Sequence, residues 1–572
     1  MNLKRRDLKS NNVKVVHEVN KYKALHKLFS LNNNIFNTSN IYFVFTITSA
    51  YVFSVLIGMY HHELWRDEIF GYSTIFYNDF LKYNGPKGCF DLNCIIYNSA
   101  LFALVHLFPS YRIFQLFHLL IVALAVYIFN RHSPFSYVQK IFFTFSYFIL
   151  FEYGIIARWY GFFILTLFIL LYLLTRKEKN YILISIFLLV LASHTISTAI
   201  FAASLTIYIL IHIINGSRTL LTSKIKRQLI ISSFIFFTGI ILVIFQYAYI
   251  YSNQGQLFNV YGHIPIFMTI RTIWSSYIPI PDFSIGGAFW NTNILPFPIT
   301  YPQSYNVVDL ITSTNIVAVV VSVLIILCCL LIYSKKLPVL LTYIFNTVVY
   351  FVFIHIFFRQ HFVRHIGLLF IIFVYCSWLY RYSDEYIRLP FFNIPRLEIR
   401  FLNSKLVDTI FVLLVTIIFF LQFISGVLTY QKLFQYQFTK SWETAEYLRK
   451  NYDDYVLVGA FDYAVQPIAA ILNKDIFFPQ TNRFSKIVEY FGVNRNPKPD
   501  IRDILQKSSH IVTYNNKKVL IILNIEIRGP NGIPISSATL LNNMLLKKIK
   551  SFEGDIIQPD EQYYLYELFR KP

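Results

Sequence analysis

The sequence predicts an α-helical polytopic membrane protein with a small α/β domain at its C-terminal end. Of the 572 residues, 56% are hydrophobic and 14% are charged, whereas soluble domains carry about 25% charged residues. Apolar runs of about 20 residues, the length that crosses a bilayer, recur up to residue 430. Beyond that point the chain alternates short helix-like and strand-like patterns. A soluble multidomain enzyme is therefore excluded, and the 19% aromatic content excludes a disordered chain.

Residues 1–40 are polar and basic, and they precede a full-length apolar run at 41–60. They lack the short apolar core and the small-residue cleavage site of a signal peptide. We therefore expect a cytoplasmic basic N-terminal segment followed by an uncleaved first membrane span.

Eleven apolar runs are candidate membrane spans, and they define a membrane domain over 41–435. Two of them, at 141–156 and 181–195, are short for a span. The predicted spans are 41–60, 114–130, 141–156, 159–175, 181–195, 197–214, 229–250, 312–333, 338–357, 364–380 and 406–429.

Basic residues alternate between the loops that connect these spans. With a cytoplasmic N-terminus, 24 lysines and arginines fall on the cytoplasmic side and eight fall on the opposite side before the tail. This positive-inside pattern accounts for the net charge of +21 without nucleic acid as a partner. An odd number of spans then places the C-terminal tail outside the cytoplasm.

Three outer segments are too long to be simple connectors: 61–113, 251–311 and the tail 436–572. Loops of this length usually have a function. The tail is expected to be an extracytoplasmic α/β domain, without the glycine-rich loop that would indicate nucleotide binding. Its predicted elements are helices at 441–448 and 462–471 and strands at 455–459, 476–478, 510–514 and 519–523.

An acidic motif, Arg66-Asp67-Glu68, follows the first span on the outer side, just after His61-His62-Glu63. A carboxylate pair at a membrane boundary can supply a general base and a second group for a cation or for hydrogen bonds. The alternative is a solvated charge cluster beside the membrane. An adjacent pair of acids does not decide between the two interpretations.

Two motifs on the same side carry an arginine or a histidine: Arg158-Trp159-Tyr160 and Ser193-His194-Thr195. The arginine fork suits a phosphate because it donates two parallel hydrogen bonds and stays charged. A histidine can bind a metal or a pyrophosphate-like group. The alternatives are an arginine that snorkels to the interface and a helix-capping turn in which the histidine bonds to the backbone.

A third basic motif, residues 359–367, contains Arg359, Arg364 and His365 on the side that is otherwise poor in positive charge. The positive-inside rule does not explain it, so an anionic ligand is the better interpretation. Arg271 is a weaker addition to the set. An acidic pair and several cations at one water–lipid boundary indicate a lipid phosphate that is attacked by a neutral nucleophile.

In their order along the chain, these motifs resemble those of the GT-C superfamily of glycosyltransferases. The similar branch is the bacterial family-39-like one, with protein mannosyltransferases and aminoarabinose transferases. The resemblance rests on Asp67-Glu68, on a hairpin over 101–131, and on the motifs around Arg158, His194 and Arg364. It covers about residues 1–430, and the tail is similar to the α/β appendix that many members carry. The bulky Trp159 inside the Arg-x-Tyr motif departs from the family pattern.

The resemblance implies sugar transfer, with inversion, from a polyprenyl-phosphate-linked donor to a lipid, glycan or protein acceptor. The reaction would occur on the periplasmic face of a bacterial inner membrane. Asp67 would act as the base, and Glu68 would assist it or help to hold a divalent cation. His62 and His194 are further candidates for binding a metal or the substrate. The donor phosphate would be bound by Arg158, Tyr160, Arg271, Arg359, Arg364 and His365.

The main alternative function is a transporter or a flippase for lipid-linked glycans. Such proteins often show internal repeats and glycine- or proline-broken spans at corresponding positions. The sequence shows no such symmetry, and its charges fall at span ends instead of mid-membrane.

The five cysteines show no spacing typical of a structural zinc site. Cys89 and Cys94 lie in the first outer loop. The sequence does not decide whether they form a disulfide or stay as two free thiols. Cys328, Cys329 and Cys376 are expected to be inert apolar residues within spans.

Overall fold

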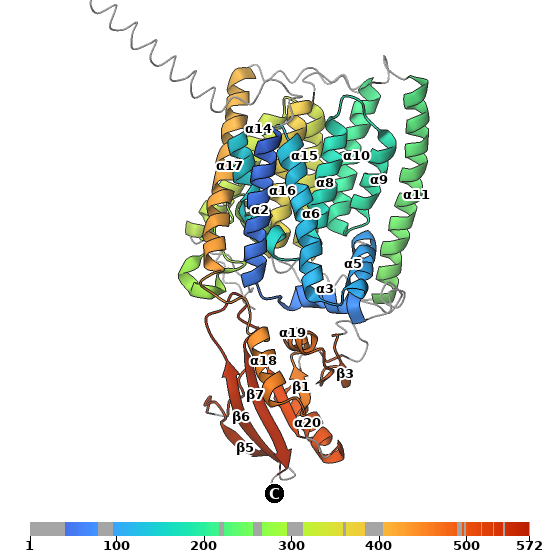
Figure 1. The fold of residues 1–572 in the computed structure, drawn as a ribbon. Coiled ribbons are helices and arrows are strands. Elements are labelled where there is room, and N and C mark those ends of the chain that lie inside the picture. Colours follow the sequence, from blue (N-terminus) through green and yellow to red (C-terminus); the bar gives the residue numbers. More distant parts are fainter. Residues whose placement is uncertain are drawn as a thin grey trace, which may run out of the picture.

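The protein consists of an elongated helix bundle with a small α/β domain at one end (Figure 1). We call this the domain end of the bundle, and the opposite end the far end. The computed structural model describes residues 40–77, 95–216, 222–254, 266–294, 313–357, 362–383, 404–488, 495–496, 499–515, 518–529, 531–540 and 544–570.

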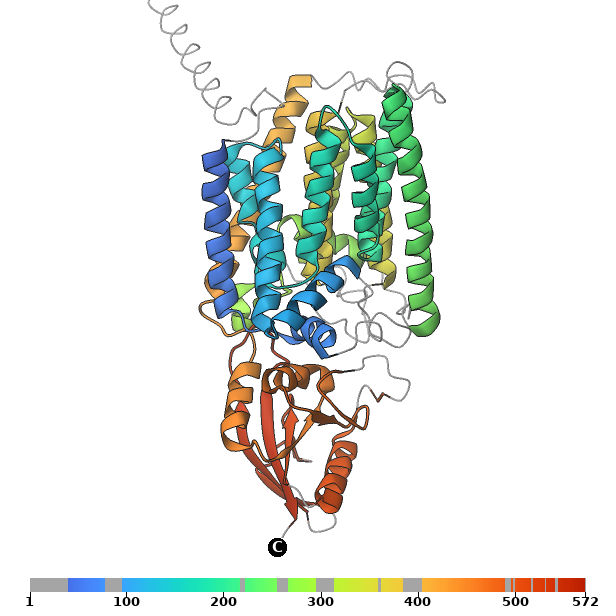
Figure 2. The ribbon, with the colours of Figure 1, turned by 45° about the vertical axis from the view of Figure 1, so that its right-hand side comes forward.

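Eight of the described helices are long and apolar enough to cross a membrane. The helix α11 (Ser223–Gln254) lies at the edge of the bundle (Figure 2). It exposes apolar side chains such as Phe234, Phe237 and Phe245, as a lipid-facing surface requires. The chain therefore has the architecture of a multi-pass membrane protein. The eight helices are α2 (Ile41–His61), α6 (Tyr111–His132), α10 (Ile196–Gly216), α11 (Ser223–Gln254), α14 (Ser313–Tyr333), α15 (Leu337–Phe357), α16 (Val363–Tyr382) and α17 (Ser404–Lys432).

The predicted count of eleven spanning helices is wrong for three segments. In place of a span at 141–156 the chain forms a short helix, α7 (Tyr137–Thr144), and a wider π-helix, η1 (Tyr147–Ile155). The helix α8 (Tyr160–Thr175) has 16 residues and α9 (Tyr181–Ala192) has 12. At about 1.5 Å per residue these helices are shorter than the ~30 Å hydrocarbon core. They still pack within the bundle, so apolar composition alone overestimated their length.

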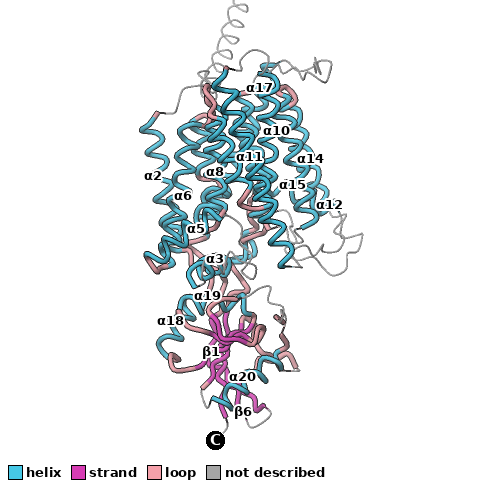
Figure 3. The backbone as a smooth tube through the Cα atoms, turned by 90° about the vertical axis from the view of Figure 1, so that its right-hand side faces the viewer, coloured by secondary structure: helices cyan, strands magenta, loops and turns pink. Residues whose placement is uncertain are grey.

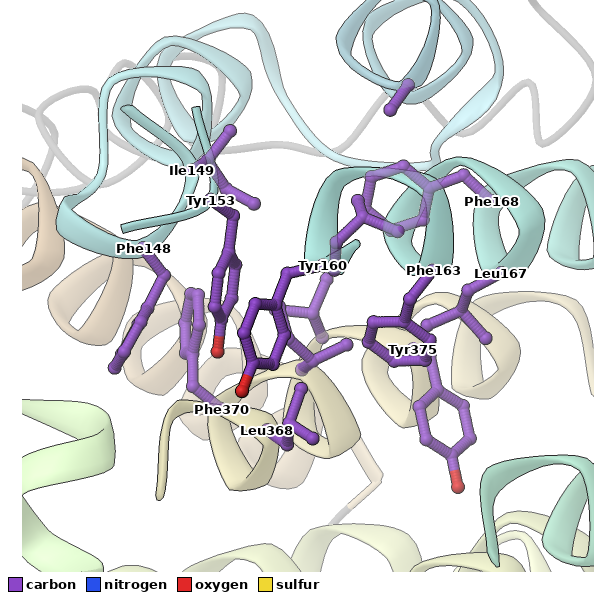
Figure 4. Close-up of a cluster of buried hydrophobic side chains, with 14 of the residues drawn as sticks. Phe148, Ile149, Tyr153, Tyr160, Phe163, Leu167, Phe168, Leu368, Phe370 and Tyr375 are labelled. Carbon is purple, nitrogen blue, oxygen red and sulfur yellow. The ribbon is translucent and has the colours of Figure 1, made fainter. Parts of the chain in front are cut away.

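Helix α16 lies at the centre of the bundle, and its residues from Val363 to Tyr380 are buried except at His365. Aromatic rings of η1, α8 and α16 stack around it (Figure 4). The rings of Tyr153 and Tyr160 lie 5.0 Å apart. A Cβ at Gly367 would meet the ring of Phe148 at 2.1 Å, so glycine is what permits this close approach.

Short helices occupy the domain end of the bundle (Figure 3). The first outer segment supplies α3 (Arg66–Tyr77) and α5 (Ile95–Leu107). The second supplies α12 (Ile266–Tyr277) and a 3₁₀ turn, η2 (Phe283–Phe289). The end of the bundle that meets the α/β domain is therefore built from the outer segments that the sequence singled out.

The C-terminal domain contains one mixed sheet with the strand order β3-β2-β1-β4-β7-β6-β5 among its described residues. β1 pairs in parallel with β2 and β4, and the other pairs are antiparallel. The strands are β1 (Val456–Ala460), β2 (Ile476–Phe478), β3 (Arg483–Ser485), β4 (Val519–Leu523), β5 (Ser537–Leu540), β6 (Met544–Phe552) and β7 (Tyr563–Arg570).

Helices cover both faces of this sheet. Leu520 and Ile522 of β4 face the helices α18 (Ser441–Asn451) and α19 (Asp462–Leu472), whereas Val519 and Ile521 face α20 (Ile501–Asn515). Side chains of a strand alternate between faces, which explains why β4 is apolar throughout.

The strand predicted at 510–514 is wrong, because this segment is the last part of α20. Its β-branched residues favoured a strand locally. However, Ile504, Ile511 and Val512 lie on one helical face, and packing of that face on the sheet decides the structure. The strands β3, β5, β6 and β7 were not among the predicted elements.

Candidate functional site

The acidic motif lies in the first turn of α3, which begins at Arg66. Carboxylates are favourable there because the unpaired amides at a helix N-terminus carry partial positive charge. The backbone amides of Glu68 and Ile69 donate to the carbonyl of Trp65 (both 3.0 Å), which fixes the start of the helix.

Three arginines from separate parts of the chain surround the carboxylate of Asp67. Oδ2 lies 3.0 Å from Nη1 of Arg158, in the loop between η1 and α8, and 3.4 Å from Nη2 of Arg364 in α16. Oδ1 lies 4.0 Å from Nε of Arg66. The Asp67 side chain keeps 27% of its surface exposed, so a ligand can reach it. The structure thus brings together three motifs that are far apart in the sequence, with separations of 91 and 297 residues from Asp67 to Arg158 and Arg364.

Two opposing effects set the pKa of Asp67. Burial favours the neutral acid, but Arg158, Arg364 and Arg66 favour the carboxylate and outweigh burial. The pKa of Asp67 is therefore lowered, and the group is a charged acceptor of protons at neutral pH.

Glu68 differs from its neighbour because it is completely buried. Oε2 lies 2.6 Å from Nε2 of His62, and Oε1 accepts a 2.6 Å hydrogen bond from the backbone amide of Ala157. Glu68 therefore joins the end of α2 to the loop that carries Arg158. This geometry favours a positioning role for Glu68 and gives His62 a partner within the protein.

Arg364 sits in an aromatic cage. Its guanidinium carbon lies 4.4 Å from the ring centre of Phe362, 5.4 Å from that of Trp65 and 5.9 Å from that of Trp290. Aromatic faces attract a cation and exclude water, which strengthens any charge–charge contact made there. The side chain is 9% exposed, so it is largely desolvated.

Tyr160 and His365 form a second polar pair beside the arginines. The Tyr160 hydroxyl lies 3.0 Å from Nδ1 of His365, and Arg158 lies over the Tyr160 ring at 5.8 Å. Hydroxyls of Tyr153 and Tyr350 donate to the carbonyls of Arg364 and His365 at 2.8 and 2.7 Å. The first turn of α16 is therefore held by tyrosines from neighbouring elements.

A pocket opens beside Asp67 and Arg158. Its other walls come from α3, α5, the start of α6 and the loop before α8. The lining residues are Asp67, Gly71, Ile75, Tyr97, Asn98, Leu101, Phe114, Ala157, Arg158 and Trp159. The lining combines apolar and aromatic side chains with the polar groups of Asp67, Asn98 and Arg158, so the pocket offers both kinds of contact to a ligand.

His194 packs on the helix α8, next to the cluster's pocket through Phe162 and Tyr97. It is completely buried, stacks on Phe162 at 4.8 Å, and has Nε2 3.5 Å from the Thr166 hydroxyl. Both contacts are with side chains of α8, and the predicted role of His194 in binding a metal or the substrate stays a prediction. Among the described residues, no group of three or more His, Cys, Asp and Glu side chains is arranged to hold a metal ion.

Several predicted residues fall in parts of the chain about which the structure gives no contacts. Arg359, Cys89 and Cys94 lie outside the described residues, and Arg271 lies in α12 with a side chain that is not described. Their predicted roles in donor binding and disulfide formation stay predictions.

Glu152 is a buried carboxylate that the sequence analysis missed. It lies in η1, where Oε2 accepts hydrogen bonds from Nε1 of Trp290 at 3.0 Å and from the Tyr147 hydroxyl at 3.2 Å. Through Trp290 it is connected to the cage around Arg364. A single acid inside a predicted span was the signal, since a charge at that depth is costly and usually functional.

No known family model matches the chain, and no curated protein sequence matches it either.

Proposed function

We propose that the protein is an integral membrane glycosyltransferase that uses a polyprenyl-phosphate-linked sugar as its donor. The observation that carries the proposal is the partly exposed carboxylate of Asp67 between Arg158 and Arg364, beside a pocket at one end of the bundle. Such a site offers a base for an acceptor hydroxyl next to cations for a phosphate. The acceptor would be a lipid, a glycan or a protein.

The donor phosphate would bind to Arg158 and Arg364. Both guanidinium groups lie at the ends of apolar helices and offer a fork of donors, and the cage around Arg364 keeps its charge poorly hydrated. Tyr160 and His365 lie next to these arginines and would donate to the remaining phosphate oxygens. The polyprenyl chain would extend into the surrounding lipid.

The ion pairs of Asp67 imply that the donor binds before Asp67 acts as a base. Without a ligand, the carboxylate is paired with the two arginines that the phosphate needs. A donor phosphate would compete for these guanidinium groups and release Asp67 as a base toward the acceptor. The base would thus become available only when the donor is in place, which limits unproductive chemistry.

In the transfer step, the acceptor oxygen attacks the anomeric carbon as its bond to the phosphate oxygen breaks. Asp67 takes the hydroxyl proton of the acceptor, and the polyprenyl phosphate leaves with the bonding electron pair. Arg158 and Arg364 stabilise the negative charge that grows on the leaving phosphate, and this selective stabilisation lowers the barrier. Attack opposite to the leaving group inverts the anomeric configuration.

The charge pattern supports a location of the site outside the cytoplasm. The far end of the bundle carries Arg131, Arg176, Lys335 and Arg381 at or next to helix ends. The positive-inside rule places this end in the cytoplasm, and the domain end then faces the periplasm of a bacterial inner membrane.

Binding of undecaprenyl monophosphate, the leaving group of such a reaction, tests the donor site. We expect the purified protein in nanodiscs to bind this lipid more tightly than phosphatidate, as measured by tryptophan fluorescence. Arg364→Ala should lose about 1.5–3 kcal/mol of binding free energy, the scale of a hydrogen bond to a charged group, and Arg364→Lys should recover part of it. Arg112→Gln, an exposed arginine at the same end, is the matched control.

Two results would contradict the proposal. Equal binding of both lipids by wild type and by Arg364→Ala would mean that the cluster does not recognise a polyprenyl phosphate. Movement of the lipid-linked sugar across a vesicle membrane, without transfer to any acceptor, would favour a flippase.

A further inference from the structure

We infer that the turn between β6 and β7, residues 553–562, is a positioning element of the site at the domain end. It holds α3, which carries Asp67, and η2, which precedes Trp290. The inference rests on the proposed function only where turnover is the readout. We call this segment the β6–β7 turn.

The first contact of the β6–β7 turn is with the start of α3. The backbone amide of Arg66 donates to Oε1 of Glu561 at 3.0 Å, and its guanidinium pairs with Asp560. The same guanidinium lies over the ring of Tyr463 at 5.1 Å. Glu561 is completely buried, and the backbone amide of Arg66 is the donor that its Oε1 pairs with.

The second contact is with η2. The backbone amide of Gly287 donates to Oδ1 of Asp555 at 2.6 Å. A Cβ at Gly286 or Gly287 would come within 2.7 Å of the Asp555 carboxylate, and Gly286 has a φ of 73°. Two adjacent glycines therefore allow the turn to approach the backbone of η2 closely.

Both held segments lead directly into the site. Asp67 follows Arg66 in α3, and Trp290 follows η2, packs on Trp65 at 4.8 Å and donates to Glu152. A further hydrogen bond joins the segment before α3 to the start of the α/β domain, because the Glu63 carboxylate accepts from the backbone amide of Thr439 at 3.2 Å.

The pairing of Arg66 with Asp560 has a chemical consequence for the base. Arg66 stays 4.0 Å from Asp67 while its guanidinium is engaged by Asp560. Without that partner, Arg66 would turn toward Asp67 and pair with it more closely. The β6–β7 turn thus orients α3 and also limits how closely Arg66 pairs with Asp67.

Variants in the full-length protein test this role. Glu561→Ala removes the acceptor for the Arg66 amide, Glu561→Gln keeps an acceptor oxygen, and Asp560→Asn releases the Arg66 side chain. Asp503→Asn is the matched control, because Asp503 lies on α20 in the same domain and pairs with Lys507. Hydrogen–deuterium exchange of the peptide over 66–77 reports on α3 without any substrate.

We expect faster exchange over 66–77 in Glu561→Ala, near wild-type exchange in Glu561→Gln, and no change in Asp503→Asn. Turnover of a polyprenyl-phosphate sugar should fall about 10–100-fold in kcat for Glu561→Ala and Asp560→Asn. The KM for the donor should stay within about twofold, because Arg158 and Arg364 are not touched.

Wild-type exchange over 66–77 in Glu561→Ala would overturn the inference, whatever the activity. Unchanged kcat in both acidic variants of a protein that does transfer sugar would overturn it as well. If the wild type transfers no sugar while the exchange result holds, the proposed function fails and the positioning role stands.

Discussion

At the residue scale, the site depends on a carboxylate whose neighbours come from distant parts of the sequence. Residue types and spacing predicted Asp67, Arg158 and Arg364 as candidates. Their meeting at 3.0 and 3.4 Å could not be predicted, because it depends on how η1, α3 and α16 pack. Glu68 was predicted as a partner of Asp67 in chemistry, but burial against His62 and Ala157 gives it a different environment.

The pH dependence of turnover should follow the charges that face Asp67. Those charges are Arg66 on the same helix, Arg158 on the loop and Arg364 on α16, with Arg158 the strongest of the three. They lower the pKa of Asp67, so the acidic limb of kcat/KM should lie below the usual carboxyl range. Arg158→Gln removes one of these positive charges, so the effect of burial on Asp67 is less strongly opposed and its pKa rises. The acidic limb of the kcat/KM profile should therefore move to higher pH.

The comparison to make is a pH series of kcat/KM for wild type, Arg158→Gln and the control Arg112→Gln. A limb at the same pH in all three proteins would show that the titrating group is not Asp67.

At the element scale, η1 is a segment whose helix type cannot be predicted from the hydrophobic pattern of its residues. Its nine residues are apolar except for Glu152, so the sequence predicts a continuous span. The chain instead widens into a π-helix after Ser146, whose hydroxyl donates to the carbonyl of Phe143 at 2.7 Å. π-helical turns are frequent at functional sites, and this one leads into the loop that carries Arg158. Hydrophobic content does not encode that change of winding.

The close packing of η1 on α16 predicts a stability effect. Gly367→Leu adds a side chain whose Cβ would lie 2.1 Å from the ring of Phe148, so the helices must separate. Overpacking of this kind costs about 1–3 kcal/mol. Gly71→Ala in α3 is the control, because nothing lies within 4 Å of its added Cβ. We expect the melting temperature in nanodiscs to fall for Gly367→Leu only, and equal melting of both variants would refute the packing described for α16.

At the scale of the whole molecule, composition predicted the division into a membrane bundle and a C-terminal α/β domain. The strands β1, β2 and β4 were found from their apolar runs, because each is buried in the sheet. β6 and β7 were missed because lysines, tyrosines and a glutamate interrupt them. The contact of their connecting turn with α3 joins residues almost 500 positions apart, with separations of 495 and 494 for the two Arg66 bonds. No local pattern predicts such a contact.

The orientation in the membrane yields a prediction for the whole chain. Reporter fusions after Lys179, Arg227 and Lys336 should report the cytoplasm, and fusions after Asn291 and Lys450 should report the periplasm. Charge bias between the two ends of the bundle is the physical reason. A cytoplasmic signal from the Lys450 fusion would place the site on the wrong face for a periplasmic reaction.

In the proposed reaction, Asp67 is the base for sugar transfer from a polyprenyl-phosphate donor. The most direct measurement follows a radiolabelled sugar from such a donor into membrane lipid, glycan and protein fractions, with wild type and Asp67→Asn compared in nanodiscs. Asparagine keeps the shape of the side chain but cannot accept the proton. We expect label transfer by wild type and a fall of ~10²–10⁴-fold in the variant, the usual contribution of a general base, with an unchanged melting temperature. Transfer at the wild-type rate by Asp67→Asn would contradict the account.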